Sequence, residues 1–511
     1  MASARTTWGL SAALGPGLAL AVVIGRGLAV ARGLAVALRR GLAVAVVATI
    51  LLGACSGSNG AAGDDSGGGD GGGGSSDGGT TPDGGLTIPD GGTPPANLFP
   101  LALSADRGSL VAHDGSPFLL HGEAAWSLIA QLTTAGAMQY LADRRTRGVN
   151  AVIANLIEHQ YADRAPANAA GDAPFTTAGD FTKPNEKYFA HADQVIDIAA
   201  AQGIAVLLVP AYLGFNGGGE GWYGEMSGLS AQQCRSYGDF VGRRYAAKSN
   251  IVWVWGGDYT PPSGDAGETC LKAIRDGILA AVPAGTLSTG HWAPESTSRD
   301  EPAFTDTIDV VGVYTYLDIL APCRTARAAT PRKPTFLVET CYENETIRSC
   351  AGTTSEVRRR QWWGLLGCGA GEISGNNPIW RFGSGWPQAL TSPVSNSQVR
   401  LTTIAHSIRW QSLAPDDDLI TAGRGSGYSE VSAATTTDTG SRQSIVYLPP
   451  DSASSVTLDL SRIGTSITAT WQDPSAVRSM SAGTDLSGSH AFAKPGKNAG
   501  GDNDWVLVLS P

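Results

Sequence analysis

Short apolar runs alternate with longer amphipathic stretches between Leu103 and about Leu413. This alternation is typical of repeated βα units around a parallel sheet. Eight apolar runs are candidate strands: "FLLHGEAAW" from Phe118, "NAVIANLI" from Asn150, "IAVLLVPAY" from Ile204, "NIVWVWGGD" from Asn250, "GTLSTGHW" from Gly285, "DVVGVYTY" from Asp309, "PTFLVET" from Pro334 and "GCGAGEISG" from Gly367. Eight units of this size predict an α/β fold, a (β/α)₈ TIM barrel. An open doubly wound sheet is the alternative, but no GxGxxG or P-loop follows any strand.

Helical stretches lie between these runs. Two of them, "AMQYLADRRTRG" and "YFAHADQVIDIAAAQG", end at Gly148 and Gly203. A glycine at this position favours the left-handed backbone that caps a helix C-terminus. We therefore expect helices that stop at both glycines.

After Asp418 the helical periodicity disappears and short alternating runs follow: "QSIVYLPP", "SVTLDL", "ITATWQDP" and "DWVLVLSP". Gly, Asp and Ser turns separate them, which is typical of an antiparallel β-sandwich. The predicted organisation is a barrel domain over residues 98–414 and a small sandwich over residues 415–511.

The first 97 residues differ from the rest. The uncharged run 41–54 follows Arg39 and Arg40 and ends "LLGAC", so residues 1–55 have the regions of an export signal with Cys55 at the cleavage point. This ending resembles the bacterial lipobox, in which the cysteine is lipidated. Residues 56–97 are rich in Gly, Asp, Ser and Pro and predict a flexible tether.

We therefore expect an exported lipoprotein of the bacterial cell envelope, attached to the outer membrane only through this lipid anchor and facing either the periplasm or the cell surface. A signal-anchor helix with a chance cysteine is the alternative, and the uncharged run 6–25 competes as a membrane span. The three "RGLAVA" repeats also leave open where translation begins.

Charge excludes one class of partner. The chain has a net charge of -10, and the first 54 residues hold five arginines and no acid. Without them the balance is 31 minus 46, or -15. Nucleic acid is therefore not an expected partner, because phosphate binding needs a basic face. We expect a monomer and no cofactor.

Six cysteines remain after Cys55, namely Cys234, Cys270, Cys323, Cys341, Cys350 and Cys368. An even number in an exported chain favours disulfides, although six cysteines allow about 15 pairings. A zinc site is the alternative, but CxxC and HExxH spacings are missing and the seven histidines are scattered. We expect structural disulfides and no metal.

Carboxylates and aromatic residues gather where the predicted strands end, and a barrel of this kind builds its site at those ends. Asp258 ends the fourth strand and Glu339 the seventh. By alternation, Val252, Val254, Gly256 and Asp258 share one strand face, and Thr335, Leu337 and Glu339 share another. If these are the inner faces, both acids look into the mouth of the barrel from roughly opposite sides.

Two facing carboxylates are the groups that glycosidic cleavage needs, and aromatic rings suit the C–H faces of sugars. A single acid at a strand end is more often a cap or an ion-pair partner, so the indication comes from the combination. The predicted substrate-binding residues are Glu123, Trp126, Asn155, Tyr212, His291, Trp292, Tyr316, Tyr342, Glu343 and Trp380.

The segments "PFLLHGEAAWSLIAQLT", "NIVWVWGGD", "KPTFLVETCYE" and "PIWRF" resemble the landmarks of the apiosidase-like glycoside hydrolases. The resemblance runs from about Phe99 to Pro511 and implies a (β/α)₈ barrel followed by a β-sandwich named for collagen binding. It implies Asp258 as general acid/base and Glu339 as nucleophile of a retaining mechanism. Glu343 is the rival nucleophile, which we place in the following loop.

Two places depart from the family pattern: Glu123 and Ala124 replace an Asp-Thr pair, and Glu372 and Ser374 replace other residues near the eighth strand. The sugar therefore stays open. The leading hypothesis is an exo-acting glycoside hydrolase with a carbohydrate substrate, namely plant-type polysaccharides or oligosaccharides. The alternative is a non-catalytic surface protein that binds glycan or collagen, and a metal-dependent hydrolase comes third.

Overall fold

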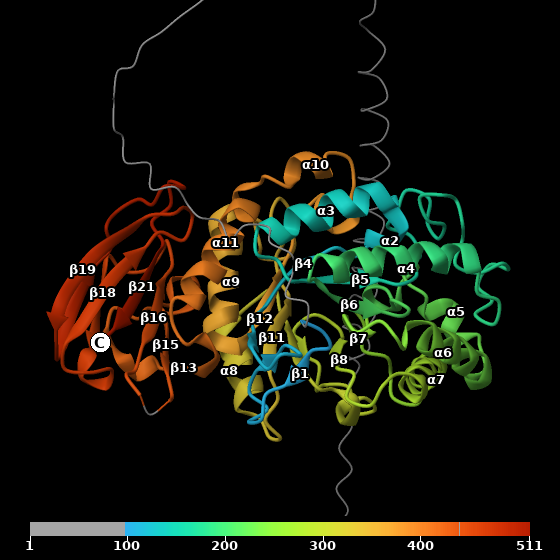
Figure 1. Ribbon diagram of the computed structural model, residues 1–511, viewed down its shortest axis with the longest axis horizontal. Helices are drawn as coiled ribbons and strands as arrows, with labels where there is room; N and C mark the ends of the chain where they lie inside the picture. The colour runs from blue at the N-terminus through green and yellow to red at the C-terminus, as the bar shows by residue number, and fades with distance from the viewer. Residues whose placement is uncertain (1–97, 439) are drawn as a thin grey trace, which may run out of the picture. The chain divides into compact units, whose positions relative to one another are not determined.

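The computed structural model describes residues 98–438 and 440–511 (Figure 1). The predicted export signal, Cys55 and the 56–97 tether lie outside these residues, so the lipoprotein hypothesis stays a prediction. Among the described residues, no helix is both long enough and apolar enough to span a bilayer.

All eight predicted barrel strands are present. In chain order they are β4 (Leu120–Ala124), β5 (Ala151–Asn155), β6 (Ala205–Val209), β7 (Ile251–Gly256), β8 (Ser288–His291), β10 (Val311–Tyr314), β11 (Thr335–Glu339) and β12 (Gly369–Ser374). The hydrogen-bonded order is β8-β7-β6-β5-β4-β12-β11-β10, with every neighbouring pair parallel. This confirms the α/β barrel.

The barrel closes between β8 and β10 through the backbone amides of Asp309 and Val310, which donate to the Ser288 carbonyl at 2.9 and 3.1 Å. A short ninth strand, β9 (Ser296–Thr297), adds to β10 in the antiparallel sense. In this connection the described chain forms β9 and a single 3₁₀ turn, Thr305–Thr307, in place of an α-helix. The fifth unit therefore departs from the predicted βα repeat.

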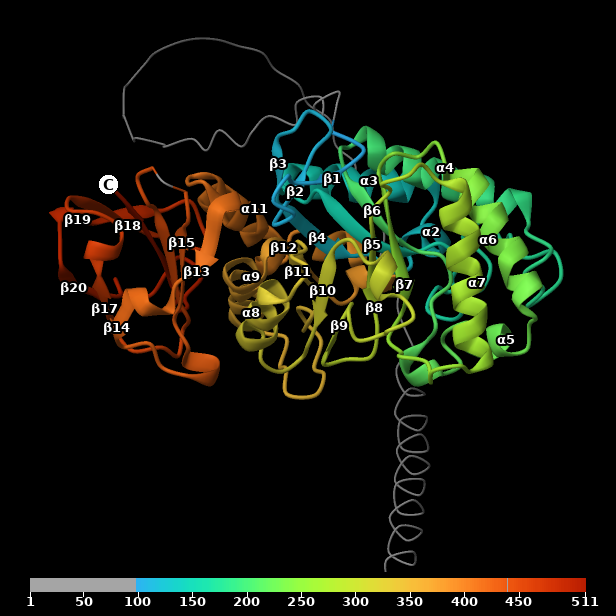
Figure 2. The ribbon, with the colours of Figure 1, turned by 90° about the horizontal axis from the view of Figure 1, so that it is seen from below.

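Helices surround the strands in Figures 1 and 2. Their bounds are α2 (Leu128–Gln131), α3 (Thr134–Thr146), α4 (Glu186–Ala201), α5 (Tyr223–Ser227), α6 (Ala231–Tyr245), α7 (Ala266–Ala281), α8 (Leu320–Ala328), α9 (Thr354–Cys368), α10 (Trp386–Ala389) and α11 (Pro393–His406). Gly148 and Gly203 follow α3 and α4 with φ of 78° and 67°, which confirms the predicted glycine caps.

Apolar side chains form one cluster inside the barrel and another between strands and helices. Val252 and Val254 belong to the inner cluster, as predicted. On β11 the alternation prediction was wrong, because Phe336 and Val338 face inward and Leu337 packs outward against α9. A register shift between Leu337 and Glu339 then turns Glu339 toward the interior.

A small antiparallel sheet precedes the barrel: β1 (Ala102–Leu103), β2 (Leu110–Val111) and β3 (Pro117–Phe118). Its side chains Leu101, Leu110 and Phe118 join the inner cluster. Because β3 leads directly into the amino end of β4, this sheet fills the end of the barrel opposite the strand carboxyl ends.

The six described cysteines form three disulfides: Cys234–Cys270 joins α6 to α7, Cys323–Cys368 joins α8 to α9, and Cys341–Cys350 closes a loop after β11. The prediction of structural disulfides is confirmed, and the structure supplies the pairing that the sequence left open.

The C-terminal part is an antiparallel β-sandwich, as predicted. Its larger sheet has the order β13-β15-β16-β21-β18-β19 and its smaller sheet β14-β17-β20. The strands are β13 (Leu413–Pro415), β14 (Ile420–Ala422), β15 (Ser432–Thr436), β16 (Ser444–Leu448), β17 (Ser455–Asp459), β18 (Ile467–Gln472), β19 (Ser479–Leu486), β20 (Ser489–Ala493) and β21 (Trp505–Ser510). A separate apolar cluster fills the space between the two sheets.

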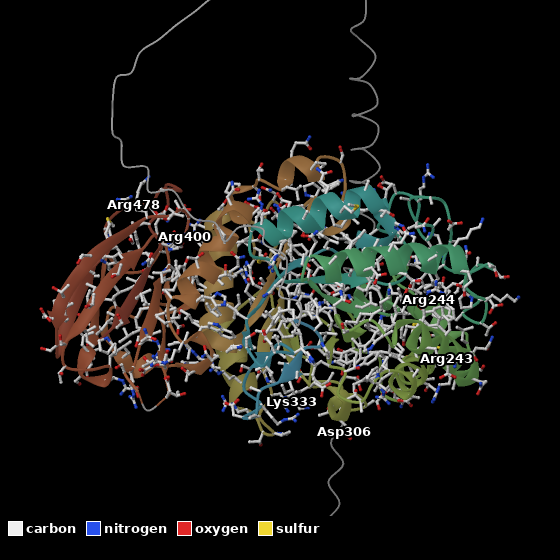
Figure 3. All side chains as sticks on the ribbon, viewed as in Figure 1. Arg243, Arg244, Asp306, Lys333, Arg400 and Arg478 are labelled. Atoms are coloured by element: carbon white, nitrogen blue, oxygen red, sulfur yellow. A yellow bond between two sulfur atoms is a disulfide. The ribbon has the colours of Figure 1, made fainter. Side chains whose placement is uncertain are left out.

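Polar contacts join this sandwich to the barrel helices. Arg358 of α9 forms a bidentate ion pair with the buried Asp504, with both N–O distances 2.7 Å. Arg400 of α11, labelled in Figure 3, donates to the Asp473 carbonyl at 3.3 Å and to Gln472 Oε1 at 3.2 Å. The ring of Trp362 in α9 stacks on Tyr447 of β16.

Candidate active site

A cavity of about 470 Å³ opens at the carboxyl ends of the barrel strands, where the sequence predicted the site. The residues around it come from the strand ends and from the loops that follow them. They are Trp126, Asn155, Tyr161, Tyr212, Phe215, Glu220, Asp258, Tyr314, Tyr316, Glu339, Tyr342, Glu345, Ile347, Arg348 and Trp380. Eight of these fifteen residues are Trp, Tyr or Phe, and four are Asp or Glu. The lining therefore combines aromatic rings with carboxylates.

Asp258 reaches this cavity because β7 ends on one glycine, Gly256, and a second, Gly257, follows it. Gly256, Gly257 and Asp258 all have positive φ, of 95°, 122° and 55°. A Cβ at Gly257 would overlap the Tyr212 ring, and one at Gly256 would overlap Trp292. Only glycine allows this close approach, and the resulting turn delivers Asp258 to the Tyr212 hydroxyl, which donates to Oδ2 at 2.5 Å.

Glu339 lies at the end of β11 and is 5% exposed. Its Oε1 accepts from the Tyr316 hydroxyl at 2.9 Å, and its Oε2 contacts His291 Nε2 at 2.9 Å. Burial raises the pKa of Glu339, and the negative charge of Asp258 raises it further, whereas the two hydrogen bonds lower it. The net direction is upward.

His291 connects the two acids. The backbone amide of Asp258 donates to His291 Nδ1 at 3.2 Å, so in the neutral ring Nε2 carries the proton and donates to Glu339. Burial lowers the pKa of His291, whereas the hydrogen bond to Glu339 and the charges of Glu339 and Asp258 raise it. The net direction of the His291 pKa is upward. The amide at Nδ1 opposes a second proton there, so we take the ring as neutral.

The two predicted catalytic acids therefore lie together. One oxygen of Asp258, one oxygen of Glu339 and a ring nitrogen of His291 all lie within 4.8 Å of one another. Such a trio could also hold a cation. Here both nitrogens of the His291 ring already have a hydrogen-bond partner: the Asp258 amide at Nδ1 and Glu339 at Nε2. These hydrogen bonds explain why the three side chains lie together.

Six of the ten predicted substrate-binding residues line the cavity: Trp126, Asn155, Tyr212, Tyr316, Tyr342 and Trp380. Among the described residues, Asn155 Oδ1 and Nδ2, Asp258 Oδ1 and Trp380 Nε1 are buried without a hydrogen-bond partner. Buried polar groups without partners are rare in folded proteins. Their presence around one cavity indicates a site for a ligand rich in hydrogen-bonding groups.

The structure places the other four predicted residues elsewhere. Glu123 is buried outside the sheet in an ion pair with Arg144 at 2.8 Å. Trp292 packs on Phe304 in the outer cluster, and His291 lies behind Glu339. Glu343 accepts from Asn376 at 2.7 Å and from the Val394 amide at 3.1 Å, so it supports the loops. None of these four residues lines the cavity. For Glu123, His291 and Trp292 the reason is that a strand-end position alone does not decide where a side chain points. Glu343 lies in a loop, where its carboxylate is held by neighbouring loop residues.

Sequence reasoning missed seven cavity residues: Tyr161, Phe215, Glu220, Tyr314, Glu345, Ile347 and Arg348. Tyr314 is the last residue of β10, so its position at a strand end could have identified it. The other six lie in loops, where no periodicity marks a side chain that faces the site.

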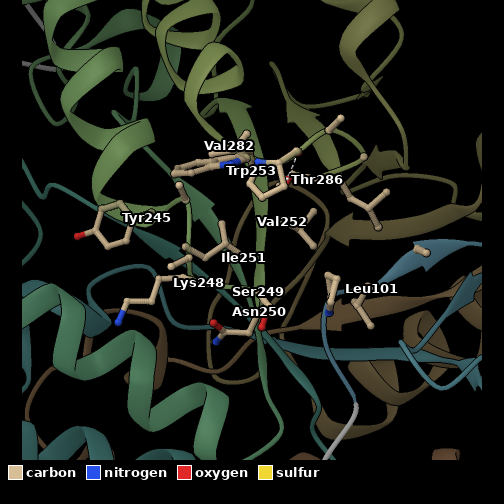
Figure 4. A pocket seen from close by; sticks show the side chains of 18 residues that line it. Leu101, Tyr245, Lys248, Ser249, Asn250, Ile251, Val252, Trp253, Val282 and Thr286 are labelled. Carbon is tan, nitrogen blue, oxygen red and sulfur yellow. Dashed lines mark hydrogen bonds between the residues drawn. The ribbon is translucent and has the colours of Figure 1, made fainter.

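A second cavity, of about 510 Å³, surrounds the amino end of β7 (Figure 4). Leu101, Tyr245, Val252, Val282 and Thr286 line it, and Lys248 is the one charged residue among its lining residues. It lies at the opposite end of the strands from Asp258 and Glu339. A cavity without an acid pair cannot perform acid-base chemistry of the kind that the first cavity supports.

Comparisons with known proteins agree with this geometry. The apiosidase-like catalytic domain family matches residues 104–412, and the family described as "Putative collagen-binding domain of a collagenase" matches residues 414–510. No curated protein sequence matches the chain significantly.

Solved structures share the fold. A glycoside hydrolase family 5 protein from Bacteroides vulgatus is 23% identical over 81% of this chain and 95% of its own, with a TM-score of 0.68. A second structure, titled glycoside hydrolase, is 23% identical over 81% and 97%, with a TM-score of 0.67. Because the catalytic-domain match covers more than half of the sequence, this chain belongs to the apiosidase-like glycoside hydrolase family.

Proposed function

We propose that this glycosidase is a retaining, exo-acting enzyme that removes sugars from plant-type polysaccharides or oligosaccharides, with Asp258 as general acid/base and Glu339 as nucleophile. The observation that carries the proposal is the approach of the two carboxylates within 4.8 Å beside an open cavity. Retaining enzymes hold their carboxyl groups ~5 to 5.5 Å apart, whereas inverting enzymes need ~6.5 to 9.5 Å to fit a water. The short spacing supports retention.

The hydrogen bonds support the division of roles. Glu339 accepts from both Tyr316 and His291, which favours its ionised form, whereas Asp258 accepts from Tyr212 and keeps Oδ1 free. Two carboxylates this close do not both ionise easily, so one proton is shared by the pair. We assign the proton-donating role of the pair to Asp258, whose side chain lines the cavity.

In the first step the Glu339 carboxylate attacks the anomeric carbon while Asp258 gives its proton to the departing oxygen. The C–O bond to the leaving group breaks and a glycosyl ester forms on Glu339. In the second step Asp258 takes a proton from water, the water oxygen bonds to the anomeric carbon, and Glu339 leaves as a carboxylate. The free sugar keeps the original anomeric configuration.

The cavity supports exo action on a terminal sugar. Its volume of about 470 Å³ is within the range of small-molecule sites. Trp126, Tyr161, Tyr212 and Trp380 surround it, with neighbouring ring centroids 5.1 to 6.1 Å apart. Rings can stack on the C–H faces of one sugar, while the unpartnered Asn155 amide can bond its hydroxyls.

The test uses the protein from Asn97 onward and a panel of pectic and hemicellulosic oligosaccharides. Asp258→Asn and Glu339→Gln should each lower kcat by at least about 10³-fold on the best substrate. A 2-deoxy-2-fluoro glycoside with a good leaving group should label Glu339 and not Glu343, as mass spectrometry of the peptides would reveal. Unchanged rates in both variants, or an inverted product by NMR, would refute the proposal.

We also propose that the protein is an exported lipoprotein anchored through Cys55 to the outer membrane. The three disulfides support an oxidising compartment, since such bonds are rare in the cytosol. Membrane fractionation of the full chain and of Cys55→Ala would test the anchor, because only the unchanged chain should stay with the membrane.

A further inference from the structure

The loop from Cys341 to Cys350, closed by its own disulfide, forms one wall of the active-site cavity. We call it the disulfide loop. It begins two residues after Glu339 and ends shortly before α9. Four cavity residues come from this short segment: Tyr342, Glu345, Ile347 and Arg348. The other two disulfides join helices of the scaffold and contribute no residue to the cavity lining.

The disulfide loop also contacts the residues that hold the catalytic acids. The Tyr342 hydroxyl accepts from Trp126 Nε1 at 2.9 Å. The Arg348 guanidinium lies over the Tyr316 ring, 5.5 Å from its centroid, and Tyr316 in turn donates to Glu339. Ile347 packs against the inner apolar cluster. The loop is thus held at several points around the same cavity.

Glu345 is the acidic residue of this loop that lines the cavity. Its carboxylate is half-buried and lines the cavity, yet among the described residues it makes no hydrogen bond and no ion pair. Burial first and the charge of Glu339 second raise its pKa to about 6, with Arg381 acting in the opposite direction. A carboxylate that faces a cavity without a partner is suited to accept hydroxyl hydrogen bonds from a ligand.

We propose that the disulfide loop is the specificity-determining wall of the active site and that Glu345 within it is a substrate-binding carboxylate that accepts hydroxyl groups of the bound sugar. This proposal rests on the function proposed above. The loop binds the substrate in the ground state, whereas Asp258 and Glu339 change its bonds. Loss of the loop's contacts therefore raises KM or Kd more than it lowers kcat.

The first test replaces Glu345 and measures KM, kcat and binding by calorimetry, the latter in a Glu339→Gln background. The probe is the oligosaccharide of the pectic and hemicellulosic panel that the unchanged enzyme cleaves fastest, or binds most tightly if none is cleaved. Glu345→Ala should raise KM and Kd at least about tenfold with kcat within about threefold. Unchanged Kd, or a fall in kcat at constant KM, would overturn the role of Glu345.

The second test opens the disulfide. A Cys341→Ser/Cys350→Ser variant should raise KM about tenfold or more, whereas the matched Cys234→Ser/Cys270→Ser variant should keep KM near its original value. Thermal unfolding of both variants separates binding from folding. Equal KM changes in the two variants, or none in either, would overturn the role of the loop. If the protein binds the glycan without cleaving it, the proposed hydrolysis is refuted. The Kd measurements on the loop variants still test whether the disulfide loop binds the sugar.

Discussion

Tyr316 is one of two residues, with His291, whose hydrogen bonds lower the pKa of Glu339. The Tyr316 hydroxyl donates to Glu339 Oε1 at 2.9 Å. The Tyr314 hydroxyl forms a hydrogen bond with the Tyr316 hydroxyl at 3.0 Å and none with Glu339. A bond to the ionised form lowers a carboxyl pKa, and it opposes the rise caused by burial and by Asp258.

Tyr316→Phe should raise the pKa of Glu339 further, because one stabilising donor is lost. Since the nucleophile must be ionised, a higher pKa moves the acidic limb of kcat/KM toward higher pH, by about one pH unit for a charge-assisted bond. The loss is then greatest at low pH and partly recovers as pH rises. Rate profiles of Tyr316→Phe and of the control Tyr314→Phe would check this, and superimposable acidic limbs would contradict it.

At the scale of elements, the turn after β7 decides where Asp258 points. Gly257 sits against the Tyr212 ring in a conformation that L side chains rarely adopt. Gly264 follows in the same connection, also with positive φ (80°), but a Cβ there would meet nothing within 4 Å. Both glycines therefore have a positive φ, but only at Gly257 would a side chain collide with a neighbouring residue, Tyr212.

Gly257→Ala should lower kcat about 100-fold, because it displaces Asp258 or Tyr212 and catalysis is sensitive to shifts of about 1 Å. Gly264→Ala should cost about 1 kcal/mol of stability with kcat preserved. Enzyme kinetics together with thermal unfolding would separate the two effects. Equal kcat values in both variants would mean that the close contact at Gly257 is unimportant.

At the scale of the whole molecule, the barrel and the sandwich share buried contacts through α9. The Arg358–Asp504 pair is buried on both sides, and Tyr447 also donates to Asp504 at 2.9 Å. The ion pair between Arg332 and Asp106, at 3.0 Å, is exposed and serves as the control for the buried pair. Since α9 follows the disulfide loop, the sandwich supports a helix that begins beside the active site.

Arg358→Ala should destabilise the protein by about 3 to 5 kcal/mol, because it leaves the Asp504 charge buried without its cation. Arg332→Ala should change the stability by at most about 1 kcal/mol, since exposed pairs contribute little. Denaturant unfolding of both variants would measure the difference. A loss in Arg358→Ala no larger than in the control would mean that this pair does not stabilise the described fold.

The sequence by itself determined the features that depend on neighbours along the chain. Apolar runs marked all eight barrel strands, and glycines marked the ends of α3 and α4. The polar residues at the carboxyl ends of the strands indicated Asp258 and Glu339 as an acid pair. Family landmarks then indicated the barrel and sandwich. These signals are local, because strand and helix periodicity repeats within a few residues.

Only the tertiary structure decided which side chains meet. The register shift on β11 reversed the expected faces and still brought Glu339 inward, while the strand-end acid Glu123 turned out to face Arg144. The disulfide pairs and the loop residues around the cavity, Glu345 among them, also needed the fold. The physical reason is that loops have no repeating pattern, and residues far apart in sequence become neighbours only when the barrel closes.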